Sequence, residues 1–194
     1  MKTKALIALA LATIISVTVF AQEKERRFAF ELSGGPSMAT REFADGLRVG
    51  FGFDGTFHYR FMPHTGIYGG WGENWFSTET SFSEANMDFE ETGYVLGLQF
   101  KHPLEGSSSS YFLRAGALYN HIEVENENGD ITGDTGHGPG LQLAAGIDIR
   151  LGSTWSLTPV VKYNALSRTL NSEGGTLDIR YNYLTVRIGI LKMF

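Results

Sequence analysis

The segment Tyr183–Phe194 constrains the fold most, because its residues alternate between two chemical types. One parity is aliphatic and the other is polar or small: Leu184, Val186, Ile188 and Ile190 against Thr185, Arg187 and Gly189. Alternation with a period of two is typical of a β-strand that has one apolar face, and it excludes an amphipathic helix. The segment therefore predicts a long amphipathic strand.

The amino terminus predicts export. Met1–Lys4 is basic, Ala5–Phe20 is apolar, and Ala21 supplies a small residue for cleavage. The apolar run is shorter than the roughly 20 residues of a spanning helix, so we interpret residues 1–21 as a signal peptide. Residues 22–194 then form one exported domain. The sequence contains no Cys, which excludes disulfides and thiolate metal sites, and its net charge of −5 argues against a nucleic-acid partner.

Alternating segments recur through the mature chain. We count eight of them, at residues 28–35, 47–61, 66–75, 92–101, 111–120, 140–151, 155–166 and 176–194. The connectors at 36–46, 76–91, 122–139 and 167–175 are longer on average than the others. Short turns at one end and longer loops at the other predict an all-β fold: an eight-stranded antiparallel up-and-down transmembrane β-barrel with both termini periplasmic. Pro159 lacks a donor for the sheet ladder, so we expect a bulge there.

The position of Arg187 sets the polarity of the barrel. If Arg187 contacted lipid near the bilayer midplane, its charge would destabilise the barrel by about 2–4 kcal/mol. The apolar residues of each segment must therefore face outward. Outward aromatic residues gather near both ends of the segments, as two girdles at the membrane interfaces. They are Phe28, Phe61, Phe100, Tyr111, Trp155 and Phe194 at the short-turn end, and Trp71, Tyr94, Tyr119 and Tyr163 at the long-loop end.

Over residues 28–194 these features resemble the small outer-membrane barrels, such as the membrane domain of OmpA and OmpX. The resemblance implies a monomer in the outer membrane of a Gram-negative bacterium. It also implies that Phe194 is similar to the assembly signal read by the barrel-assembly machinery.

Charged residues of the inward parity are the candidate functional residues. They are Glu31, Asp54 and Asp148 with Arg48, Arg60, Lys101, Arg114, Arg150, Lys162 and Arg187. An eight-stranded barrel has room only for its own side chains, and charges in such a lumen must be paired. We therefore predict an ion-pair plug. The alternative is a narrow, weakly anion-preferring pore whose preference comes from Arg60, Lys101, Arg114 and Arg150.

Two of the long connectors are acidic and contain no Lys or Arg. Their carboxylates are Glu79, Glu84, Asp88, Glu90 and Glu91, and then Glu123, Glu125, Glu127, Asp130 and Asp134. Such charges solvate exposed loops. They could also hold divalent cations that bridge to lipopolysaccharide phosphates, because hard cations take oxygen ligands.

The sequence carries no catalytic motif that we can identify. Lipid-modifying barrels resemble one another in placing a His and a Ser two residues apart on one strand, and no His here has a Ser at that spacing. G-x-S-x-G and H-E-x-x-H are also missing. We predict a non-enzymatic protein without cofactor or metal, with a structural or surface-interaction role. The alternatives are a small channel and a lipid-modifying enzyme.

Overall fold

The computed structural model describes residues 26–40, 47–78, 88–125, 131–172 and 175–194, and within them the chain forms nine strands. Their bounds are β1 Phe28–Thr40, β2 Gly50–Arg60, β3 Thr65–Ser77, β4 Asp88–Pro103, β5 Ser110–Glu125, β6 Ile131–Asp134, β7 Gly138–Arg150, β8 Trp155–Ser172 and β9 Gly175–Met193. The predicted signal peptide lies outside the described residues. No helix among the described residues is long and apolar enough to cross a membrane.

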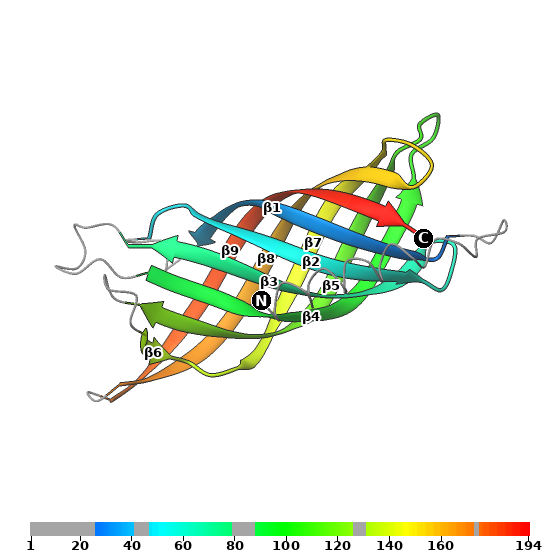
Figure 1. Ribbon diagram of the computed structural model, residues 1–194. Coiled ribbons are helices and arrows are strands. Elements are labelled where there is room, and N and C mark those ends of the chain that lie inside the picture. The colour runs from blue at the N-terminus through cyan, green and yellow to red at the C-terminus, as the bar shows by residue number, and fades with distance from the viewer. Residues whose placement is uncertain (1–25, 41–46, 79–87, 126–130, 173–174) are drawn as a thin grey trace, which may run out of the picture.

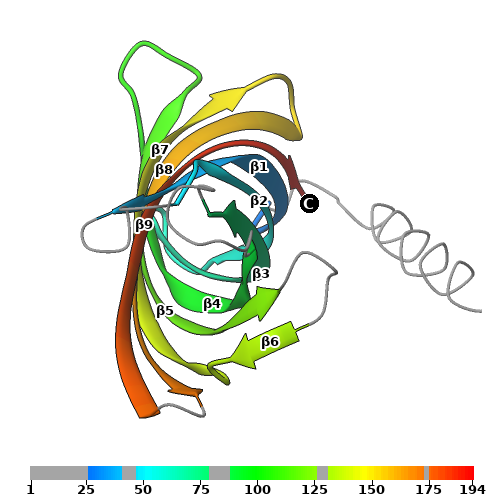
Figure 2. The ribbon, with the colours of Figure 1, turned by 90° about the vertical axis from the view of Figure 1, so that its left-hand side faces the viewer.

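Eight of the described strands close into a barrel. The antiparallel order is β4-β3-β2-β1-β9-β8-β7-β5, and β4 pairs with β5 to complete the ring (Figures 1 and 2). The short β6 pairs only with β5, through Glu123 and Asp134, and lies outside the ring. The predicted eight-stranded antiparallel up-and-down barrel is confirmed.

The two ends of the barrel differ in their connections. At one end, which we call the turn end, lie the turns at 61–64, 104–109 and 151–154, together with the start of β1 and the end of β9 (right side of Figure 1). These turns are tight: Leu104 N donates to Ser109 O at 2.9 Å, and Gly106 adopts a φ of 70° that residues with a Cβ rarely adopt. The connections from β1 to β2, from β3 to β4 and from β5 to β7, the last of which includes β6, are longer and lie at the opposite end, the loop end, whereas only two residues separate β8 from β9 there.

The strands extend further toward the loop end than the sequence predicted. β4 already begins at Asp88, β5 continues to Glu125, and the β8–β9 hairpin pairs as far as Ser172 and Gly175. The predicted connectors 76–91, 122–139 and 167–175 were therefore too long. A strand crosses a bilayer in about 9–11 residues, so these strands leave the lipid, and beyond it a paired strand no longer needs an apolar face.

The polarity of the wall is as predicted. Outward Leu96 is 67% exposed and Ile188 is 63% exposed, whereas Arg187 is 1% exposed inside the barrel. The predicted bulge at Pro159 is wrong. Pro159 pairs with Ile188 in an unshifted β8–β9 register, and the β7–β8 ladder is only interrupted beside it, with the same register on both sides. Because Pro159 has no N–H, the β7–β8 ladder loses pairs beside it, but neither strand gains the extra residue that a bulge would require.

Candidate functional site

In the half of the lumen nearer the turn end, which we call the turn half, Glu31 on β1 is the centre of a buried cluster. Its Oε2 accepts a hydrogen bond from the Arg114 guanidinium of β5 at 2.6 Å and lies 3.0 Å from Nε2 of His58 on β2. Its Oε1 accepts one from Thr158 Oγ1 of β8 at 2.9 Å. Glu31 therefore links strands on opposite sides of the ring, and its 1% exposure shows that these contacts fill the space between them.

Asp54 is the centre of a second cluster. Its Oδ2 lies 2.8 Å from Lys162 Nζ and 3.1 Å from Arg187 Nε. The Arg187 guanidinium continues to Ser37 Oγ at 3.0 Å, to Asn74 Oδ1, and to the carbonyl oxygens of Gly35 and Pro36. A third pair joins Lys101 to Asp148. Each buried charge of these clusters has a partner of opposite sign, as burial away from water requires.

Glycines give the long side chains room. A Cβ added to Gly52 would lie 2.6 Å from Arg187 Nη2, and one added to Gly116 would lie 2.5 Å from Tyr68 Oη. Arg187 and Tyr68 can extend past the neighbouring strand because these positions, each two strands away around the ring, have no side chain.

Three of the predicted lumen bases lie at the ends of the barrel and outside the buried clusters. Arg48 precedes the first residue of β2 at the loop end and is exposed. Arg150 is the last residue of β7 and is exposed at the turn end, where Arg60 also lies, at the end of β2. The inward parity continues to these positions, but all three lie at or beyond a strand end, where the barrel is open to solvent.

The predicted girdle residues lie on the outer wall. Phe28, Phe61, Phe100, Tyr111, Trp155, Tyr94 and Tyr119 are exposed, and Trp71, Tyr163 and Phe194 are half-buried. Neighbouring rings cover part of this surface, for example Phe53 and Trp71 with centroids 5.4 Å apart.

In the half nearer the loop end, the loop half, the sequence reasoning missed a buried carboxylate. Glu91 is 1% exposed and accepts hydrogen bonds at Oε2 from Asn74 Nδ2 and Tyr183 Oη, both at 2.7 Å. Asn120 Nδ2 donates to its Oε1. These donors are all neutral. The inward parity of Gly97, Val95 and Gly93 continues to Glu91, so extending the alternation would have found it.

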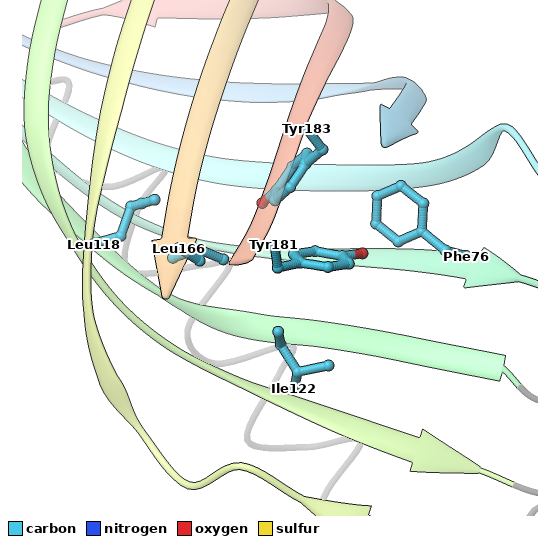
Figure 3. Close-up of a cluster of buried hydrophobic side chains, with 6 residues drawn as sticks. All are labelled: Phe76, Leu118, Ile122, Leu166, Tyr181 and Tyr183. Atoms are coloured by element: carbon cyan, nitrogen blue, oxygen red, sulfur yellow. The ribbon is translucent and has the colours of Figure 1, made fainter. Parts of the chain in front are cut away.

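A cluster of buried apolar and aromatic side chains lies in the same half of the barrel (Figure 3). The cluster consists of Phe76, Leu118, Ile122, Leu166, Tyr181 and Tyr183. Phe76 packs edge-on against both tyrosines, with ring centroids 5.5 and 5.6 Å apart. Arg168, which the sequence analysis placed in a connector, is buried in the same half of the lumen. Its guanidinium donates to the carbonyls of Gly138 and Pro139 at 2.5 and 2.6 Å.

Little space remains between the two halves. A cavity of 20 Å³ lies between Asp54, Glu91 and Arg187, which is room for about one water molecule. At the turn end the lumen opens into a cavity of 620 Å³ beside His58 and Lys101.

The predicted acidic loop residues are only partly described. Glu79, Glu84, Glu127 and Asp130 lie outside the described residues. Asp88, Glu90 and Glu91 belong to β4, Glu123 and Glu125 to β5, and Asp134 to β6. On the β5–β6 hairpin, His121 Nδ1 lies 3.5 Å from both Glu123 Oε1 and Asp134 Oδ1, a spacing at which three ligands could hold a metal ion.

Solved structures share this architecture. Neisserial surface protein A is 14% identical, with a TM-score of 0.65, over 86% of this chain and 97% of that one. The attachment invasion locus protein of Yersinia pestis is 14% identical with a TM-score of 0.55, over 88% of this chain and 100% of that one. OprG from Pseudomonas aeruginosa is also 14% identical with a TM-score of 0.55, over 88% of this chain and 99% of that one. These likenesses show the fold alone.

No curated protein sequence matches the chain. The outer membrane protein beta-barrel domain family matches residues 7–190, nearly the whole length of the chain. Polar side chains fill the lumen and aliphatic side chains cover the outer wall, as this family match predicts. The chain belongs to the family of outer-membrane protein β-barrel domains.

Proposed function

We propose that this protein is a non-conducting, non-enzymatic barrel of the Gram-negative outer membrane that acts at its loop end as a structural or surface-interaction module. Its turns and both termini lie on the periplasmic side in this proposal, and the longer hairpins project outward. The asymmetry between short turns and long hairpins supports this orientation.

The observation that carries the proposal is the closed lumen. The Glu31–Arg114 cluster and the Asp54–Arg187 cluster fill the turn half, and the Phe76–Tyr183 cluster fills the loop half. The cavity between them holds about one water molecule. Two closures in series among the described residues support a lumen without a continuous aqueous path for a hydrated ion.

Planar-bilayer recording tests this closure. The purified wild-type protein should show no steady conductance. A variant that opens only the loop half, Phe76→Ala with Tyr183→Ala, should also be silent, because the turn half remains closed. Adding Glu31→Ala and Arg114→Ala removes one of the two clusters of the turn half, so this combined variant is the first in which conductance should appear, and heat-modifiable gel mobility shows whether each variant is folded. A steady wild-type conductance would support the alternative of a small channel and overturn the proposal.

A lipid-modifying activity is the other alternative. We expect lipid A and phospholipid masses to be unchanged when the gene is deleted. A mass difference restored by the wild-type gene would establish an enzyme and contradict the proposal.

The chemistry of the loop end supports a particular class of partner. Asp88, Glu90, Glu123 and Asp134 lie there on strand ends, at exposed or half-buried positions. The Yersinia pestis neighbour has been solved with sucrose octasulfate, a heparin analogue. A polyanion of that kind would be repelled by these carboxylates, so we favour a basic partner surface, or lipopolysaccharide bridged by divalent cations through His121, Glu123 and Asp134.

Binding of lipopolysaccharide to the folded protein tests the bridging. We expect Mg²⁺ to promote binding and EDTA to reverse it, and Glu123→Gln with Asp134→Asn to abolish the Mg²⁺ effect. Glu105→Gln is the matched control, because Glu105 is an exposed carboxylate in the turn at the other end. Binding that does not depend on Mg²⁺, or that the control weakens equally, would contradict the bridge.

A further inference from the structure

The cavity at the turn end, which we call the vestibule, has an unusual lining. Its volume is 620 Å³. The described residues that line it include five basic side chains and no carboxylate: Arg26, Arg27, Arg60, Lys101 and Arg150. The whole chain has a net charge of −5, so this concentration of positive charge runs against the overall composition.

Hydrogen bonds hold the rim of the vestibule in place. Arg60 N donates to Arg27 O at 2.8 Å, and the Arg60 guanidinium donates to Arg26 O at 3.3 Å. The Arg26 guanidinium donates to the carbonyl of Ser153 in the 151–154 turn. The segment before β1 is therefore tied to β2 and to the far side of the mouth, which keeps its two arginines beside the cavity.

The floor of the vestibule contains a buried polar atom without a partner among the described residues. His58 lines the cavity, and its Nε2 lies 3.0 Å from Glu31 Oε2. A carboxylate accepts hydrogen bonds, so Nε2 is the donor of this pair. His58 Nδ1 is buried and has no hydrogen-bond partner among the described residues. It can accept a hydrogen bond from a ligand when the ring is neutral, or donate one when the ring is charged.

One of the five basic side chains of the vestibule is paired with a buried carboxylate. Lys101 is paired with Asp148, which is 2% exposed beneath it. Arg60 and Arg150 lie at strand ends around the mouth and both line the cavity. A cleft lined by one sign of charge concentrates counter-ions of the opposite sign.

We propose that the vestibule is a blind binding site for a phosphate-bearing ligand, a phosphate monoester or diester. Guanidinium groups bind phosphate oxygens in pairs, and several of them converge here. The volume lies within the range of about 300–1,000 Å³ typical of small-molecule sites and exceeds the needs of inorganic phosphate. The Glu31–Arg114 cluster closes the floor, so the ligand enters and leaves by the turn end.

Such a phosphate could belong to a soluble compound or to a phospholipid headgroup of the adjoining leaflet. Isothermal titration of the folded protein in a zwitterionic detergent at low salt separates these sources, with glycerol 3-phosphate, a soluble monoester, as one probe and dihexanoylphosphatidylglycerol, a diester, as the other. Dihexanoylphosphatidylcholine controls for binding of acyl chains. We expect at least one anionic probe to bind, more weakly as salt is added.

The decisive comparison uses arginines at the two ends. Arg60→Gln with Arg150→Gln should weaken binding about 100-fold, because each of the two lost charge-assisted contacts contributes about a factor of 10. Arg48→Gln removes an exposed arginine at the loop end and should leave binding unchanged. Heat-modifiable mobility confirms that the variants are folded. The proposal would be overturned if neither anionic probe bound, or if the wild type, the Arg60/Arg150 variant and Arg48→Gln bound with equal affinity. The planar-bilayer recordings test only the closed lumen and are independent of this result.

Discussion

The two halves of the lumen bury a carboxylate to the same extent by different means. Glu31 and Glu91 are each 1% exposed. In the turn half, Glu31 is held by the Arg114 cation and His58, whereas in the loop half Glu91 is held by amide and hydroxyl donors of Asn74, Asn120 and Tyr183. The difference teaches that a narrow barrel needs a filled lumen but does not need ion pairs throughout, because aromatic packing fills the loop half.

Glu31→Gln should have the largest effect. The amide keeps the shape but leaves the Arg114 guanidinium, whose side chain is 2% exposed, without its counter-charge. Removing one partner of a buried pair costs about 3–5 kcal/mol. Urea unfolding of the protein in lipid vesicles, followed by tryptophan fluorescence, measures the loss. A change below about 1 kcal/mol would show that Arg114 finds water or another partner.

Tyr183→Phe should have an intermediate effect. It deletes the donor to Glu91 Oε2 at 2.7 Å but keeps the ring that packs against Phe76. A hydrogen bond to a charged group is worth about 1.5–3 kcal/mol, which is the expected loss in unfolding free energy. Phe76→Leu, which changes packing and no hydrogen bond, is the companion variant. An unchanged stability in Tyr183→Phe would mean that this hydroxyl does not hold the carboxylate.

Glu91→Gln should change stability by less than about 1 kcal/mol, in contrast to Glu31→Gln. Asn120 Oδ1 is buried without a hydrogen-bond partner among the described residues. If the Asn120 amide turns over, this oxygen can accept from the NH2 group of the new Gln, while the single Gln oxygen still accepts from Asn74 and Tyr183. The same unfolding assay decides, and a loss as large as that of Glu31→Gln would remove the distinction between the two halves.

Arg150→Gln should have the smallest effect on stability, within about 0.5 kcal/mol, because the side chain is exposed at a strand end. It should nevertheless weaken phosphate binding at the vestibule. A marked loss of stability would place Arg150 in the structural clusters of the turn half rather than in a binding site.

The architecture could be predicted from the sequence because a membrane wall imposes a strict alternation. The outward parity of Leu96, Leu98 and Phe100 and the inward parity of Arg114 and Arg187 are both visible in the chain. The inward position of Glu31 and Asp54 follows from the same parity.

The pairing of these charges could not be predicted. Glu31 meets Arg114 from a strand 83 residues away, across the ring, and that contact depends on the tilt and relative register of strands that no local pattern encodes. Glu91 was misplaced for a different reason. The apolar signal ends near Tyr94, although the ladder continues with Glu91 opposite Ile122. Hydrophobicity marks where lipid ends and not where the sheet ends.

The contacts of Arg187 also bear on how the ring is joined. The β1–β9 ladder lacks pairs at Gly35 and Pro36, and there the Arg187 guanidinium donates to both carbonyls, spanning 152 residues of sequence to Gly35. The entropic cost of loop closure grows with such separation, and contacts between distant segments slow folding. We therefore expect the pairing of β1 with β9 to form last during folding. The Arg187 guanidinium stabilises this pairing where the ladder hydrogen bonds are missing.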